Sequence, residues 1–137
     1  MATNLEKLRA AYKVWGDSKG ADMKPFLALI DDSFVMRSVA PAPPGLEFAG
    51  VKTGTSNLVA SFKSMLDHWT MNFYRAETLI GDGDQVAMFG RCSFTFKATG
   101  KGDETPIANL WTFKNGKAVE CIEIFDSAKA AMAASPG

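Results

Sequence analysis

An Asn-Gly dipeptide at positions 115 and 116 constrains this chain most, because two β-rich runs flank it between Ile107 and Asp126. Asn-Gly readily adopts the positive φ angles of a two-residue turn, so the segment predicts an antiparallel hairpin. Pairing across such a turn places alternate residues of both runs on one face. That face carries Asn109, Trp111, Phe113, Ile122, Ile124 and Asp126. An amide and a carboxylate buried without partners cost about 1–3 kcal/mol or more, so the pattern indicates a cavity wall with a polar role.

A different turn would change this assignment. A type I turn with a bulge at Gly116 shifts the pairing by one residue. In that register Glu123 and Phe125 face inward with Asn109. Asp126 then reaches the pocket only from the last turn of the strand. The sequence leaves both registers open.

The composition is that of an ordinary globular protein, and we expect one domain over residues 1–137. Fifteen basic residues balance fifteen acidic ones, with no run of Lys or Arg, so we expect no nucleic-acid partner. No apolar run approaches the roughly 20 residues that span a bilayer, and the N-terminus lacks a signal-peptide block, so no membrane association is expected. Cys92 and Cys121 fall within predicted strands as small buried thiols, which fits a reducing cytoplasm.

The first half of the chain predicts helices. Residues 3–6 match a capping box, and apolar residues then recur at helical spacing through Trp15. Asp22 is a suitable cap for a second helix that continues to Ile30 and is closed by the next two aspartates. A third helix is predicted from about Thr53 to Trp69.

The second half is β-rich. Turn clusters at 81–84, 99–103 and 114–117 separate four runs, which predict an antiparallel meander. The predicted strands, with one earlier in the chain, are residues 33–39, 71–80, 85–99, 105–113 and 118–125. A short helix is predicted after Ser127. This order of elements predicts an α+β fold, with helices on one face of a curved, mostly antiparallel sheet.

Five short segments fall in a familiar order along the chain: Asp31–Ser38, Phe48–Gly50, Gly81–Asp84, Asn109–Lys117 and Glu123–Asp126. They resemble the SnoaL-like and ketosteroid-isomerase-like branch of the nuclear transport factor 2 superfamily, over nearly the whole chain. The resemblance implies a cone-shaped, strongly curved sheet packed against three N-terminal helices and enclosing a deep pocket. It does not name an activity, because this scaffold carries isomerases, polyketide cyclases, dehydratases, epoxide hydrolases and non-enzymatic binders.

The resemblance to ketosteroid isomerases covers only part of their catalytic set. Tyr12 matches their oxyanion-donor tyrosine, and Asn109 matches their second oxyanion-hole residue. Arg37 stands where these isomerases carry the general-base aspartate. A guanidinium, with a pKa above about 12, cannot serve as that base.

Two other branches share the final strand. In SnoaL-like cyclases the base is an aspartate at the end of the last strand, and Asp126 occupies that position. Limonene-epoxide-hydrolase-like members use Arg-x-Asp on a central strand with a final-strand aspartate. Here Arg91 is kept and Ser93 replaces the acid.

Together these residues predict an enzyme that uses acid–base chemistry, without cofactor or metal, in a mostly apolar pocket. It would isomerise, cyclise or dehydrate a small apolar or oxygen-rich organic ligand. The predicted catalytic residues are Asp126 as the proton carrier, Asn109 as an oxyanion donor, and Arg91 as an orienting group. The predicted ligand-binding residues are Tyr12, Trp15, Arg37, His68 and Trp111.

Plain structural roles compete with several of these assignments. Asp126 would also cap the tail helix, Arg91 would serve as an exposed strand residue, and His68 suits a helix C-terminus. A second hypothesis is a binding protein that uses the same pocket without chemistry. A third is an epoxide-hydrolase-like enzyme in which Asp126 activates water and Glu123 or Glu120 supplies the acid.

The long strand predicted at 85–99 also bears on assembly. Arg91 shares one face with Ala87, Phe89 and Ser93, and the other face carries Met88, Cys92, Phe94 and Phe96. If the Arg91 face lines the pocket, the other apolar face needs cover, which a second subunit would supply. We therefore expect a homodimer formed through the outer face of the sheet.

Overall fold

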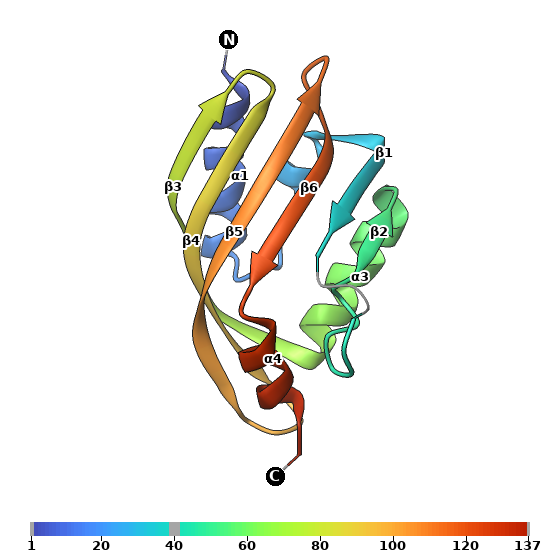
Figure 1. Ribbon diagram of the computed structural model, residues 1–137, viewed down its shortest axis with the longest axis vertical. Coiled ribbons are helices and arrows are strands. Elements are labelled where there is room, and N and C mark those ends of the chain that lie inside the picture. Colours follow the sequence, from blue (N-terminus) through green and yellow to red (C-terminus); the bar gives the residue numbers. More distant parts are fainter. Residues whose placement is uncertain (1, 39–41, 137) are drawn as a thin grey trace.

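The computed structural model describes residues 2–38 and 42–136, which form four helices and one six-stranded sheet (Figure 1). The helices are α1 (Asn4–Asp17), α2 (Lys24–Leu27), α3 (Thr55–His68) and α4 (Ser127–Ala134). The strands are β1 (Ile30–Arg37), β2 (Val51–Thr53), β3 (Trp69–Asp82), β4 (Gln85–Phe96), β5 (Gly102–Lys114) and β6 (Lys117–Phe125). The predicted α+β class is confirmed.

The sheet has the order β2-β1-β6-β5-β4-β3, and β1 and β6 pair in parallel while the other neighbours pair antiparallel. In Figure 1, α1 lies behind β3, β4 and β5, α3 lies beside β1 and β2, and α4 lies below the end of β6. The predicted strong curvature is matched only loosely, because the bend is concentrated in the lower halves of the long strands. The three predicted helices are present, but α2 has a single turn and α3 follows β2.

The second helix is shorter than predicted because tertiary pairing takes its last residues. The backbone carbonyl of Leu29 accepts a hydrogen bond from the Ala118 amide, and Ile30 pairs with Ala118 in the sheet. Strand β2 was missed because three residues are too few to show alternation. The strand predicted at 33–39 starts earlier and ends at Arg37, and position 39 lies outside the described residues.

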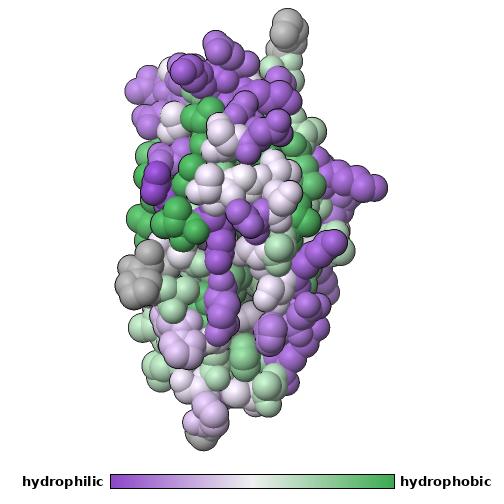
Figure 2. Space-filling view, turned by 90° about the vertical axis from the view of Figure 1, so that its right-hand side faces the viewer, coloured by the Kyte–Doolittle hydropathy of each residue, from purple (hydrophilic) through white to green (hydrophobic). Residues whose placement is uncertain are grey.

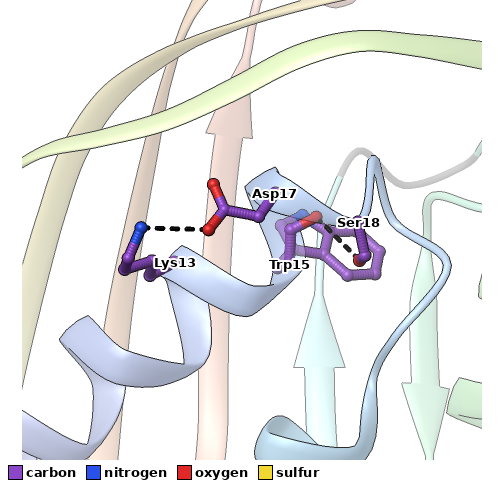
Figure 3. Close-up of polar contacts among 4 residues, drawn as sticks. All are labelled: Lys13, Trp15, Asp17 and Ser18. Carbon is purple, nitrogen blue, oxygen red and sulfur yellow. Dashed lines mark hydrogen bonds and ion pairs between the residues drawn. The ribbon is translucent and has the colours of Figure 1, made fainter.

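Helix α1 forms as its capping box predicts. The Thr3 hydroxyl accepts a hydrogen bond from the Glu6 amide at 3.1 Å, and the Glu6 carboxylate accepts one from the Thr3 amide. Figure 3 shows the other end, where Lys13 and Asp17 form an exposed ion pair and the Ser18 hydroxyl donates to the carbonyl of Trp15. The opposite face of the helix is buried and carries Leu8, Ala11, Tyr12 and Trp15.

The hairpin between β5 and β6 has the predicted two-residue turn, with positive φ angles at Asn115 and Gly116. A bulge nevertheless shifts the register, because Phe113 pairs with Ala118 whereas Thr112 pairs with Glu120. Beyond this point Asn109 faces Glu123 and Ile107 faces Phe125. The first predicted face is therefore wrong: Ile122 and Ile124 lie on the outer surface, and Glu123 and Phe125 point inward with Asn109.

The bulge has a packing reason. Ala118 and Cys121 are both fully buried, yet they are three residues apart. Two residues with odd spacing cannot face the same side of a regular strand, so one extra residue must be inserted between them. The bulge lies at Val119 and not at Gly116, although its consequence is the one that the alternative register predicted.

The two sides of the sheet differ in their cover. Met88 and Cys92 are buried on the face that α1 and α3 cover. The other face exposes large apolar side chains, with Phe89 52% and Ile124 67% accessible. Figure 2 views the edge with β1, β2 and α3, where hydrophilic residues dominate the upper end and the right-hand side, and hydrophobic residues gather most clearly on the upper left. Among the described helices, none is long and apolar enough to cross a membrane.

Candidate functional site

A cavity of about 120 Å³ lies between the inner face of the sheet and the four helices. Its lining is mostly aromatic and aliphatic, with rings from α1, α2, α3 and five strands. Among the described residues, the charged side chains on this lining are Glu123, Asp126 and Lys129. The site is thus an apolar cavity into which a few polar groups project, as small-molecule sites usually are.

Four of these side chains form a hydrogen-bonded chain across three elements. The Trp111 indole Nε1 donates to the Tyr12 hydroxyl at 2.7 Å, and that hydroxyl donates to Asn109 Oδ1 at 2.6 Å. Asn109 Nδ2 donates to Glu123 Oε2 at 3.2 Å and to its neighbouring backbone carbonyl. The chain brings α1, β5 and β6 together at one point and ends on a carboxylate.

Burial controls the charge of that carboxylate. Withdrawal from water raises the pKa of Glu123 from its ordinary 4.5 to about 7, and the hydrogen bond from Asn109 opposes this rise. Burial therefore has the larger effect. Near neutral pH the group is present in both ionised and protonated forms, so it can accept a proton or release one.

The neighbouring hydroxyl groups stay neutral. Burial raises the pKa of Tyr12 and of Tyr74 well above the ordinary value, so each keeps its proton. The Tyr12 proton is already directed to Asn109. The Tyr74 hydroxyl lies 3.4 Å from the same Asn109 oxygen, which is long for such a bond. Tyr74 is thus the hydroxyl more easily turned toward a ligand.

Several predicted site residues lie where the sequence placed them. Tyr12, Trp15, Asn109 and Trp111 all line the cavity. Asp126 also contributes to the lining, but its carboxylate accepts a hydrogen bond from the Lys129 amide and forms the N-cap of α4. The capping role that competed with its catalytic assignment is confirmed.

Three predicted residues lie outside the cavity. Arg91 is on the outer face of β4, because Met88 and Cys92 take the inward positions, and it pairs with Glu104 at 3.1 Å. Arg37 pairs with Glu120 at 2.7 Å, and its neighbour Met36 points into the cavity instead. Neither arginine is among the residues that line this cavity.

His68 is also displaced from the predicted site. It is exposed at the last turn of α3, where its Nδ1 lies 2.9 Å from the carbonyl oxygen of Ser64. The helix C-terminal role that competed with ligand binding is the observed one.

Two residues of the site were missed or given a minor place. Glu123 entered only through the alternative register and as a third-hypothesis acid. Tyr74 could have been found, because it lies within a predicted strand, but bulges on both sides of it, between 71 and 73 and between 76 and 78, break the alternation. Among the described residues there is no group of three His, Cys, Asp or Glu side chains that could hold a metal ion.

Comparisons with known proteins agree with this architecture. The model of the SnoaL-like domain family matches residues 8–121. A comparison with curated proteins found no match. Among solved structures, the chain is similar to an NTF2-like protein of Burkholderia thailandensis, with 25% identity, a TM-score of 0.85, and coverage of 99% of this chain and 100% of that chain.

Two further solved structures share the fold, and each was determined with a small molecule. One is a hypothetical protein with a ketosteroid isomerase-like fold from Catenulispora acidiphila, in complex with trimethylamine. It is 11% identical, with a TM-score of 0.74 and coverage of 96% of this chain and 94% of that chain. The other is TerC co-crystallised with polyporic acid, 22% identical, with a TM-score of 0.71 and coverage of 96% and 97%.

Proposed function

The chain belongs to the SnoaL-like domain family, and we propose that its cavity carries out acid–base chemistry on a small organic molecule, with Glu123 as the group that moves the proton. One observation carries this proposal: a carboxylate with a pKa of about 7 projects into an aromatic cavity and is oriented by an amide. A base whose pKa lies near the working pH is the efficient choice for proton transfer.

The proposed reaction begins at a carbon next to a carbonyl group. Ionised Glu123 takes a proton from that carbon, and negative charge develops on the carbonyl oxygen. The Tyr74 hydroxyl supplies a hydrogen bond to this oxygen, because its bond to Asn109 is weak and easily exchanged. Protonated Glu123 then returns the proton to another atom of the same molecule, which gives an isomerisation. Loss of hydroxide from the neighbouring carbon, or attack on a second carbonyl, gives dehydration or cyclisation.

The cavity favours a small uncharged ligand. Its volume of about 120 Å³ is close to the roughly 150 Å³ cavity that is known to hold a benzene ring. Arg37 and Arg91 point elsewhere, and Glu123 would repel an anion. Within the predicted class of small apolar or oxygen-rich ligands, we therefore propose a neutral, one-ring carbonyl compound. The two relatives described with trimethylamine and polyporic acid support a small organic ligand in general.

Deuterium exchange tests the proposal without knowledge of the natural substrate. One-ring ketones are incubated with the protein in D₂O, and incorporation at the α carbon is measured by mass spectrometry. We expect the parent protein to catalyse exchange and Glu123→Gln to lose about 10²–10⁴-fold of that rate. Glu120→Gln is the matched control, because Glu120 lies on the same strand but pairs with Arg37 on the outer face. Equal rates in the parent and Glu123→Gln would refute the proposal.

A non-catalytic binding protein is the second candidate. It is favoured by the hydrogen bonds within the site, because Trp111, Tyr12 and Asn109 already satisfy one another. Such a protein would bind a ketone and exchange none of its α protons. The third hypothesis, an epoxide-hydrolase-like reaction, loses its arginine because Arg91 lies outside the cavity.

We also propose a homodimer formed through the outer face of the sheet. The premise in the sequence was wrong, since Met88 and Cys92 are buried within the chain. The support is now an apolar patch in two adjacent rows of paired residues, namely Ile80, Ala87, Leu110 and Ile122 in one row and Phe89, Ala108 and Ile124 in the other. The two buried free thiols support a reducing location such as the cytoplasm.

Sedimentation velocity tests the dimer. Ile124→Glu places a charge at the β6 end of the second row, on the most exposed side chain of the patch, and is expected to give a monomer. Met132→Glu is the matched control, because Met132 is similarly exposed but lies on α4. A monomeric parent protein would refute the dimer.

A further inference from the structure

Trp111 is three hydrogen bonds away from Glu123 but begins the chain that ends there. Its indole donates to Tyr12, Tyr12 donates to Asn109 Oδ1, and Asn109 Nδ2 donates to Glu123. Trp111 and Tyr12 are both nearly fully buried, so water does not replace these partners. The direction of each bond therefore follows from the chemistry of the groups.

The direction is set by Trp111, because an indole N–H can only donate. The Tyr12 oxygen must accept that bond, so the one hydroxyl proton of Tyr12 points the other way. The Asn109 atom that meets this proton has to be the carbonyl oxygen. The amide nitrogen of Asn109 is then directed to Glu123, where it favours the ionised carboxylate.

The opposite orientation of Asn109 would reverse these preferences. Its nitrogen would face Tyr12, leaving the Tyr12 proton without an acceptor in a buried site. Its oxygen would face Glu123, and only a protonated carboxyl could donate to it. The two orientations of Asn109 thus correspond to the two protonation states of Glu123. The Trp111 donor favours the first of them, together with the Ala108 carbonyl, which accepts a hydrogen bond from the same amide nitrogen.

We propose that Trp111 is a positioning residue for Glu123, which acts through Tyr12 by holding the amide nitrogen of Asn109 toward the carboxylate. The importance of this control for catalysis rests on the proposed function, but the control itself does not. The other ionisable groups in electrostatic contact with Glu123 are Tyr12, Tyr74, Cys92 and Cys121. Burial raises the pKa of each of these, so they stay neutral from pH 4 to 9. The cavity lining also carries Asp126, which caps α4, and Lys129.

The test is an NMR titration of Glu123 in protein carrying glutamate labelled with ¹³C at the carboxyl carbon, with Glu123→Gln to assign the signal. In Trp111→Phe the donor is lost, Asn109 can reverse, and the Glu123 pKa should rise by about one unit. A merely structural effect has the opposite sign, because a smaller side chain admits water and lowers the pKa of a buried carboxyl.

Two further variants complete the experiment. Trp15→Phe is the matched control, since Trp15 lines the same cavity and packs against Tyr74 without belonging to the chain. Its Glu123 pKa should not rise. Tyr12→Phe removes the proton that selects Asn109 Oδ1, so it should raise the pKa even if Trp111→Phe does not fold. An unchanged or lowered pKa in the folded chain variants would overturn the proposal. Failure of the proposed function would instead show as unchanged exchange rates in Glu123→Gln.

Discussion

Glu123 Oε2 accepts a hydrogen bond from Asn109 Nδ2 at 3.2 Å, at directly paired positions of β6 and β5. This pairing exists only because a bulge near Val119 shifts the register of the hairpin. At this position two effects on the carboxyl group oppose each other. Burial raises its pKa, and the hydrogen bond from the Asn109 amide lowers it. The balance leaves a carboxylate suited to proton transfer near neutral pH.

The first prediction concerns stability against pH. The unfolded chain releases the Glu123 proton near pH 4.5 and the folded chain near pH 7, so the folded state holds more protons between these values. Raising the pH through this window should therefore lower the free energy of unfolding by roughly 3 kcal/mol. Urea unfolding from pH 4 to 8 measures it. Glu123→Gln should remove this component and be more stable than the parent at pH 8, while Glu120→Gln should retain it.

The second prediction separates the two roles of Asp126. Asp126→Ala should lower the free energy of unfolding by about 1 kcal/mol, because α4 loses its N-cap. Asn caps a helix as well as Asp does, so Asp126→Asn should keep the parent stability. It should also keep the parent rate of α-proton exchange. A stable Asp126→Asn variant without exchange activity would instead identify Asp126 as the base.

The third prediction concerns the oxyanion donor. Tyr74→Phe removes a hydroxyl whose hydrogen bond to Asn109 is long, at 3.4 Å, so the fold should be little affected. The rate of α-proton exchange should fall by about 10²-fold, the size expected for loss of one donor to a developing oxyanion. Ketone affinity, measured by calorimetry, should change far less. A variant with parent-like exchange would exclude Tyr74 from this role.

The fourth prediction concerns the two displaced arginines. Arg37→Gln and Arg91→Gln should bind and exchange ketones as the parent does, because both side chains form ion pairs outside the cavity. Each exposed pair contributes at most about 1 kcal/mol to stability. Calorimetry and the exchange assay measure the two quantities. A large loss of affinity in either variant would mean that the arginine reaches the ligand.

Most of the fold could be predicted because local signals and tertiary structure agree. The capping box at Thr3, the Asn115-Gly116 turn and the four β-rich runs each specify an element that the structure contains. The prediction failed where pairing with distant strands decided the outcome. Ile30 joins β1 because it pairs with Ala118, and the residues around Ile30 carry no local pattern that would predict this pairing.

The site was less predictable because it depends on which face of each strand points inward. An alternating pattern gives two faces but does not say which one is covered. For β4 both faces were considered. The catalytic assignment of Arg91 required the inward one, whereas the structure has the exposed strand arginine that competed with it. For β6 the turn was predicted correctly, but the bulge inside the strand turns Glu123 inward and Ile122 and Ile124 outward. A one-residue shift of this kind is set by packing of Ala118 and Cys121, not by the turn.

The Glu123 carboxyl group projects into an apolar cavity, and a ¹³C NMR titration of the labelled parent protein tests directly whether it titrates near neutrality. We expect a midpoint near pH 7 that disappears in Glu123→Gln. A midpoint near 4.5, the ordinary value for glutamate, would place this carboxylate in water and contradict the account.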